Sequence, residues 1–393
     1  MIVDKPMLGA PTFILIGGTL TLSMLDIGFQ LTKSYGFFAA LCSILLGNIL
    51  LTCIAFPVAR IAFATGLNTV ELTTRIFGNK NGKYLFSIIM AALMICWAAI
   101  QLDFISVNLK LIVTQYTNYS INPIFFSIIF GILTMSFVLY GISKLNTLSK
   151  ILLIPIIAIF LLFIKMSSAI QGNFSFYFPE LSIVIAVMFG LFIDLPTFLC
   201  IVPSWKEAKK ILIGTFLVGA SFIEILGALY ATSNQALTLH DYLFTGKIGW
   251  SLSIMMCLII AGFMANIGNN YSAGICLKTL FPSCSFTTCV IAAGIMGIVL
   301  ACVGPSQHMY LLLEIMGVVM ASISIGTVSW WLAGPPSKYT LIAWFLGMGI
   351  GFGSLAGLWV LTTDAMLDTA IVSGIAYCIL NVLSRRYDVD HQR

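Results

Sequence analysis

Charged residues are scarce in this sequence. Asp, Glu, Lys and Arg together make up 8% of its 393 residues, whereas 60% are hydrophobic and the mean hydropathy is +1.06. Soluble domains typically carry about 25% charged residues. The low charge excludes a water-soluble globular fold, because too few polar groups are present to cover its surface. The composition therefore predicts an all-α integral membrane protein whose main solvent is lipid.

Catalytic and metal-binding signatures are also missing. The three histidines lack metal-ligand spacing, and the ten cysteines stand singly in apolar runs, without the paired spacing of a zinc site or a disulfide framework. The sequence contains neither the Ser, His and Asp order of a hydrolase nor a glycine loop for phosphate. We therefore expect no enzymatic activity, no cofactor and no bound metal.

Apolar runs of roughly the ~20 residues that cross a bilayer recur along the whole chain. No small-residue cleavage pattern follows the first run, so we expect a retained span and not a signal peptide. We count twelve runs, at 11–31, 35–58, 84–113, 121–141, 151–164, 181–202, 211–231, 250–277, 286–302, 309–332, 341–361 and 366–380.

Lysine and arginine are unevenly divided between the two sides of these spans. Of the 19 basic residues, Lys33, Lys110, Lys165 and Lys247 fall on one side and the other 15 on the opposite side. Basic residues accumulate in cytoplasmic loops, so we expect a multi-pass protein of the cytoplasmic (inner) membrane with both termini in the cytoplasm. This bias accounts for the net charge of +5, so no nucleic-acid partner is expected.

Two carboxylates occupy similar positions in spans one and six. Asp26 lies in LDIG and Asp194 in IDLP, each followed within two residues by a glycine or proline. Such residues interrupt helices, and discontinuous helices at corresponding positions of inverted repeats mark transporter binding sites. We expect both spans to be broken at these acids, facing a shared watery chamber. Two non-equivalent breaks also favour a carrier over a channel, because a channel usually has pore-lining rings formed by repetition of identical subunits.

Several segments resemble, in order, the nucleobase–cation symporter family that includes cytosine permeases and hydantoin transporters. GNILL at 47–51 is similar to its second span, and GLNTVELTTRIFGNKNGKY at 66–84 to its following loop. LYGISKLNTLSKILLIPIIAI at 139–159 resembles the entry to the fifth span, and ILNVLSRR at 379–386 the closing helix. Together these segments cover nearly the whole chain.

The resemblance implies a single transmembrane domain over 1–393 with a leucine-transporter-like (LeuT-like) fold. Two inverted five-helix repeats, at about 11–170 and 180–333, would be followed by two extra helices at about 339–384. It further implies ion-coupled import of a small planar nitrogen heterocycle, such as cytosine or a related pyrimidine or purine, by alternating access. An alternative on the same fold is a cationic metabolite or a vitamin precursor of the thiamine and hydroxymethylpyrimidine type. The oligomeric state is left open.

Trp97 and Gln101 in the third span are the first candidate substrate ligands. They are four residues apart and so project from one helix face. In the family, a tryptophan here stacks on the heterocycle and a glutamine one turn later bonds its edge. A π surface beside an amide suits such a ring. The alternative is that Trp97 packs between helices and Gln101 makes an interhelical bond.

Further candidates come from spans eight and six. The eighth-span amides are too polar to face lipid, and the resemblance assigns one of them to the substrate. At least one of the three asparagines of this span is expected to form a hydrogen bond between helices instead. In span six the resemblance assigns a substrate-contacting break, with Phe192 as a second aromatic wall. These candidates are Asn266, Asn269, Asn270, Gly190, Phe192 and Asp194.

The coupling ion is left open between H⁺ and Na⁺. Sodium-coupled family members use hydroxyls early in the eighth span, whereas the corresponding residues 263–265 are Phe, Met and Ala. Ser23 and Asn266 could compensate in part. An ionised Asp costs on the order of 3 kcal/mol at the bilayer centre, so Asp26 and Asp194 are expected to be paired, protonated or functional. Together they favour proton coupling, or a substrate with a cationic edge.

Overall fold

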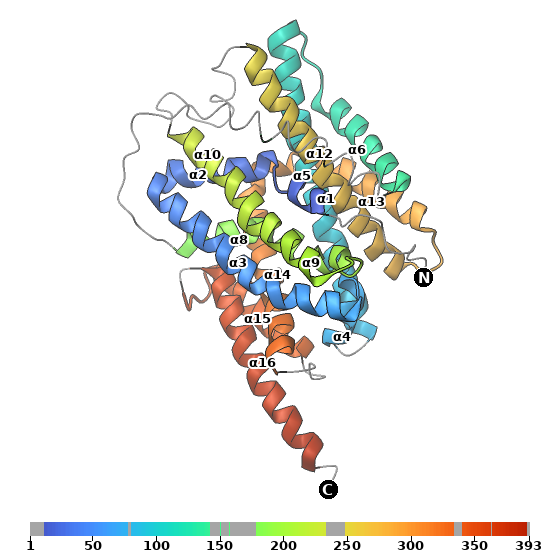
Figure 1. The fold of residues 1–393 in the computed structure, drawn as a ribbon, viewed down its shortest axis with the longest axis vertical. Coiled ribbons are helices and arrows are strands. Elements are labelled where there is room, and N and C mark those ends of the chain that lie inside the picture. The colour runs from blue at the N-terminus through green and yellow to red at the C-terminus, as the bar shows by residue number, and fades with distance from the viewer. Residues whose placement is uncertain are drawn as a thin grey trace.

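A computed structural model describes residues 12–77, 80–141, 178–232, 248–333, 340–362 and 364–390, with single residues at 150 and 157. Within these residues the chain forms helices and no strand (Figure 1), which confirms the predicted all-α class for this part. The elements are α1 (Thr12–Gly17), α2 (Leu22–Tyr35), α3 (Phe37–Thr65), α4 (Thr69–Phe77), α5 (Lys80–Thr117), α6 (Pro123–Tyr140), α8 (Phe178–Leu199), α9 (Trp205–Leu212), the π-helix η1 (Ile213–Ala220), α10 (Ser221–Ala231), α12 (Ile248–Leu280), α13 (Phe286–Ala301), the 3₁₀ turn η2 (Pro305–His308), α14 (Met309–Ala333), α15 (Thr340–Leu355) and α16 (Ala365–Asp390).

The helices follow the predicted apolar runs. Among the described residues, seven helical segments are long and apolar enough to cross a membrane, and α13 and α15 are shorter apolar helices. Eleven of the twelve predicted runs overlap described helices. The fifth, at 151–164, lies outside the described residues except for residue 157, so the count of twelve stays a prediction, as do the two inverted repeats.

The first span is broken, as expected, but not at the expected place. α1 ends at Gly17 and α2 begins at Leu22. Between them Thr19 donates to the Ile16 carbonyl from its backbone N–H, at 3.1 Å, and from its hydroxyl, at 2.7 Å. The predicted break at Asp26 and Gly28 is wrong, because both residues lie inside α2.

Gly28 is needed for helix packing and not for a break. A Cβ placed on it would lie 1.8 Å from the backbone oxygen of Glu224 on α10, and a Cβ on Gly227 would lie 1.9 Å from that of Leu25 on α2. The two glycines therefore let the backbones of α2 and α10 touch, a common role of small residues in membrane helices.

The sixth span is continuous, so its predicted interruption at Gly190 to Pro196 is wrong: α8 runs from Phe178 to Leu199 with Pro196 inside it. The hydroxyl of Thr69 on α4 explains why the helix survives its proline. It donates to the Ile193 carbonyl at 3.2 Å and accepts from the Thr197 N–H at 3.2 Å. Neighbouring hydroxyls that bond freed backbone groups are what allows proline inside membrane helices.

Three helices, α5, α8 and α12, pack against the broken first span and position the site. α5 packs along α12, while α3 packs along α8 and α2 lies against α10 (Figure 1). α1 contacts α12, and α2 contacts α5 and α8. The short non-helical segment 18–21 therefore lies where α5, α8 and α12 converge.

Candidate substrate site

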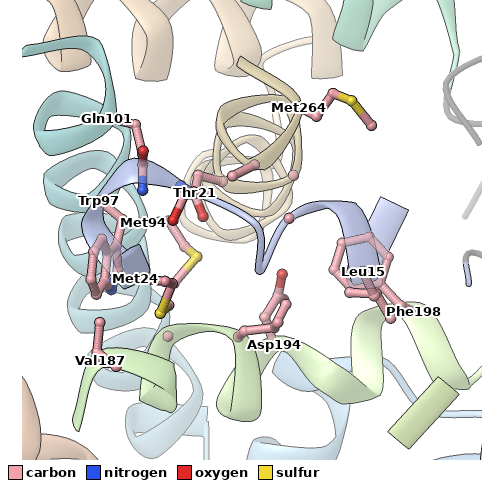
Figure 2. A pocket seen from close by; sticks show the side chains of 16 residues that line it. Leu15, Thr21, Met24, Met94, Trp97, Gln101, Val187, Asp194, Phe198 and Met264 are labelled. Atoms are coloured by element: carbon pink, nitrogen blue, oxygen red, sulfur yellow. The ribbon is translucent and has the colours of Figure 1, made fainter. Parts of the chain in front are cut away.

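A cavity of about 60 Å³ lies at this convergence (Figure 2). It is lined by the broken first span together with α5, α8 and α12. Its volume suits a small solute rather than a peptide or an oligosaccharide. The lining residues are Leu15, Gly18, Thr21, Met24, Met94, Trp97, Gln101, Val187, Gly190, Leu191, Asp194, Phe198, Met264, Ala265, Gly268 and Asn269.

Trp97 lies on α5 and lines the cavity while being 5% exposed. Its indole edge lies against Gly190 of α8, where a Cβ would come within 2.7 Å of Nε1. The same Nε1 is buried without a hydrogen-bond partner. The structure thus brings Trp97 and Gly190 together, with glycine leaving the space that the indole occupies.

Gln101 lines the same cavity one turn along α5. Its Nε2 donates to the Ser23 hydroxyl of α2 at 2.9 Å, and the Ser23 and Thr21 hydroxyls are 2.9 Å apart. Thr21, which directly precedes α2, was not among the sequence candidates, and no pattern in the sequence singles it out. This polar chain connects α5 to the broken span beside the cavity.

Asp194 is the carboxylate of the cavity. It points from α8 toward the non-helical segment of the first span (Figure 2) and is 4% exposed. Ser272 of α12 donates to its Oδ2. Among the described residues no cation pairs with it, since the one salt bridge joins Lys210 to Glu207. A buried acid of this kind can accept from the N–H groups of a ligand, or hold a proton.

The three eighth-span asparagines have different surroundings. Asn269 lines the cavity, whereas Asn266 and Asn270 do not. Asn270 faces α13, since its Nδ2 lies 3.4 Å from where a Cβ on Gly294 would be. Both amide atoms of Asn266, and Nδ2 of Asn270, are buried without a partner.

Two candidates lie away from the cavity. Asp26 is on α2, where Gln30 donates to it at 3.4 Å, and it does not line the cavity. Phe192 packs on Phe189 and lines a separate small cavity beside α4 and α14. In a continuous helix Phe192 lies 200° from Asp194, and the aromatic side chain of α8 that lines the cavity is Phe198.

Met264, one of the residues that stand where sodium-coupled family members are expected to have hydroxyls, lies close to the first span. The terminal methyl of Met264 lies 3.2 Å from where a Cβ on Gly17, the last residue of α1, would be. Ser23, which the sequence suggests as a partial substitute, is engaged with Gln101 and Thr21. Asn266, the other suggested substitute, does not line the cavity. Sodium requires several oxygen ligands, and a thioether supplies none.

Solved transporter structures share this architecture. Mhp1, described as a nucleobase-cation-symport-1 family transporter, in a closed conformation with bromovinylhydantoin bound, aligns with a TM-score of 0.74 at 16% identity, covering 97% of this chain and 93% of that one. The chain has a transporter fold. A Na⁺-coupled sialic acid symporter aligns with a TM-score of 0.69 at 10% identity, covering 96% and 90% of the two chains.

The likeness extends to transporters of other solutes. A manganese transporter of Eremococcus coleocola aligns with a TM-score of 0.61 at 12% identity, covering 95% of this chain and 92% of that one. No protein-family model and no curated protein matches the sequence. The resemblance expected from the sequence is therefore confirmed at the level of the fold, which is that of multi-pass membrane transporters.

Proposed function

We propose that this protein is a secondary active transporter related to the nucleobase–cation symporters, importing a small planar nitrogen heterocycle by proton-coupled alternating access. The observation that carries the proposal is the buried cavity with an indole on one side and Gln101, Asn269 and Asp194 around it. An aromatic face stacks on flat rings, while amide and carboxyl groups bond the N–H and C=O groups at a ring edge.

The first span supports movement around this cavity. Its two halves, α1 and α2, are separated by four residues, so α2 can change its angle to α5 and α12 without breaking a helix. In this conformation, the hydrogen-bonded side chains of Thr21, Ser23 and Gln101 connect the first span to α5. Alternating access would exchange these contacts for others on the opposite side of the membrane.

Protons are the proposed coupling ion, in a cytoplasmic membrane. Met264 supplies no oxygen where the resemblance predicts a sodium-binding hydroxyl, and Asp194 is a buried acid that no described cation neutralises. Uptake should persist in choline medium and collapse when a protonophore is added. Strict dependence on sodium would overturn this part of the proposal.

The substrate class is tested by a thermal-stability screen of purified protein against nucleobases, hydantoins, pyrimidine vitamin precursors and amines, at two pH values. We expect a nucleobase or hydantoin to raise the melting temperature. Trp97→Ala should abolish the rise, because the stacking surface is gone, whereas Phe192→Leu on the far side of α8 should keep it. An unchanged affinity after Trp97→Ala would refute the stacking role.

A second candidate is a cationic metabolite or thiamine-type precursor, which Asp194 favours because the carboxyl lies in the cavity without a described cation. If amines stabilise the protein and neutral heterocycles do not, the second candidate replaces the first.

A further inference from the structure

A second buried acid lies outside the cavity, in the seam where α10 meets α2 and α3. Glu224 on α10 has an exposed fraction of 0%. Its Oε2 accepts a 2.6 Å hydrogen bond from the amide nitrogen of Asn48 on α3. Its backbone oxygen lies at the close crossing with Gly28 of α2. The side chain is thus fully buried and bonded to α3, on a residue whose backbone contacts the half of the first span that follows the break.

The hydrogen-bonded pair of Glu224 and Asn48 lacks one hydrogen-bond donor. Glu224 Oε1 and Asn48 Oδ1 are both buried acceptors without a donor. Nearly all buried polar groups have a hydrogen-bond partner. A carboxylate and an amide can form one hydrogen bond of this kind, whereas a carboxylic acid and an amide can form two, because the acid O–H donates to the amide oxygen. A proton on Glu224 would therefore supply the donor that both atoms lack.

No described cation neutralises Glu224, since Lys210 and Glu207 form the one salt bridge among the described residues. The hydrogen bond that the structure records to its carboxyl comes from a neutral amide. A buried and unpaired carboxylate is strongly unfavourable. The titratable and charged residues on the elements packed against α10 are Asp26, Lys33 and Tyr35 on α2 and Cys42, Cys53 and Arg60 on α3, with none on η1 and with Tyr230 on α10 itself.

We propose that Glu224 is a proton-binding site of the transport cycle, protonated in this conformation and deprotonated when the seam between α2 and α10 opens to water. The coupling role rests on the proposed function. The closed seam and the bound proton stabilise each other. If the seam closed on a deprotonated Glu224, it would bury a negative charge whose one recorded hydrogen bond comes from the neutral amide of Asn48. By linkage, a conformation that hydrates Glu224 releases its proton.

Infrared spectroscopy tests the proton without any substrate. Purified wild-type protein at neutral pH should show the C=O stretch of a protonated carboxyl group, shifted in D₂O. Glu224→Gln should lose a component of this band, while its amide can still make both bonds to Asn48. Glu207→Gln is the matched control, because Glu207 is partly exposed and paired with Lys210. A band unchanged in Glu224→Gln overturns the proposal.

Proteoliposomes with an internal pH dye test the coupling, with cytosine, uracil and hydantoin as probes. Wild-type protein should acidify the lumen when a probe enters. Glu224→Gln should lose this proton flux at least ~10-fold while still exchanging labelled for unlabelled probe. Proton flux at the wild-type rate in Glu224→Gln overturns the coupling role. If no probe moves through wild-type protein, the proposed function fails, and the infrared result alone decides whether Glu224 holds a proton.

Discussion

Gly190 is the residue on which the position of Trp97 depends. A Cβ there would come within 2.7 Å of the indole Nε1. We predict that Gly190→Ala displaces the ring and weakens heterocycle binding by roughly 1–3 kcal/mol, the usual cost of overpacking. Titration calorimetry with the best ligand from the screen measures this. Gly349→Ala is the control, because nothing lies within 4 Å of its added Cβ. Equal affinities in both variants would contradict this role.

The site could be predicted from the sequence where its residues share a helix face. Trp97 and Gln101 are one turn apart on α5, and both line the cavity. Gly190 and Asp194 are likewise one turn apart, and continuing that spacing leads to Phe198, whereas Phe192 faces away. The choice among the three eighth-span asparagines depends on how α12 is rotated against α5 and α13. That rotation is set by packing between helices, which the sequence does not record locally.

At the scale of helices, Thr69 supports the proline-containing part of α8. Its hydroxyl bonds both the Ile193 carbonyl and the Thr197 N–H. Thr69→Val keeps the shape of the side chain but leaves two buried backbone groups without this partner. We predict a loss of about 1–3 kcal/mol of stability, seen as a lower melting temperature in detergent. Thr69→Ser retains the hydroxyl and should remain close to wild type. A Thr69→Val protein as stable as Thr69→Ser would show that the hydroxyl is dispensable.

The crossing of α2 and α10 leaves no room for a side chain at Gly28. The added Cβ of Gly28→Ala would overlap the Glu224 backbone oxygen at 1.8 Å, and backbone cannot move aside as a flexible side chain can. We predict destabilisation at or above the upper end of the ~1–3 kcal/mol range for overpacking. Thermal unfolding measures it, with Gly349→Ala again as the control. Wild-type stability would mean that the two helices separate easily.

Both helix breakers of the sequence, Gly28 and Pro196, lie inside helices. A glycine or proline removes local support for a helix, but whether the helix ends depends on what another element supplies at that point. α4 supplies a hydroxyl at Pro196, and α10 supplies a backbone surface at Gly28. The actual break, at residues 18–21, contains a Gly-Thr segment that the sequence does not distinguish from many others. Local patterns therefore predicted two broken spans, of which the first is broken at another position and the sixth is continuous.

At the scale of the whole molecule, the positions of the membrane spans follow from the hydropathy of the sequence alone. Apolar runs of sufficient length must cross the bilayer as helices, because backbone groups cannot go unpaired in lipid. This requirement is why eleven predicted runs overlap described helices. The arrangement of the spans could be predicted only from the family resemblance, because neighbouring helices such as α2 and α10 are far apart in the chain. Their contact depends on Gly28, which the sequence suggests as a helix breaker, and on Gly227, which no sequence pattern singles out.

The orientation of the molecule is the remaining property that the sequence predicts. Fifteen of 19 basic residues fall on one side of the predicted spans, together with both termini. A green fluorescent protein fused after Arg393 should therefore fluoresce, since it folds in the cytoplasm, and alkaline phosphatase at that position should be inactive. Alkaline phosphatase inserted in the turn between α5 and α6, at residues 118–122, should be active, because Lys110 and this turn belong to the opposite side. Active phosphatase at the C-terminus would show that the number or orientation of the spans differs from the prediction.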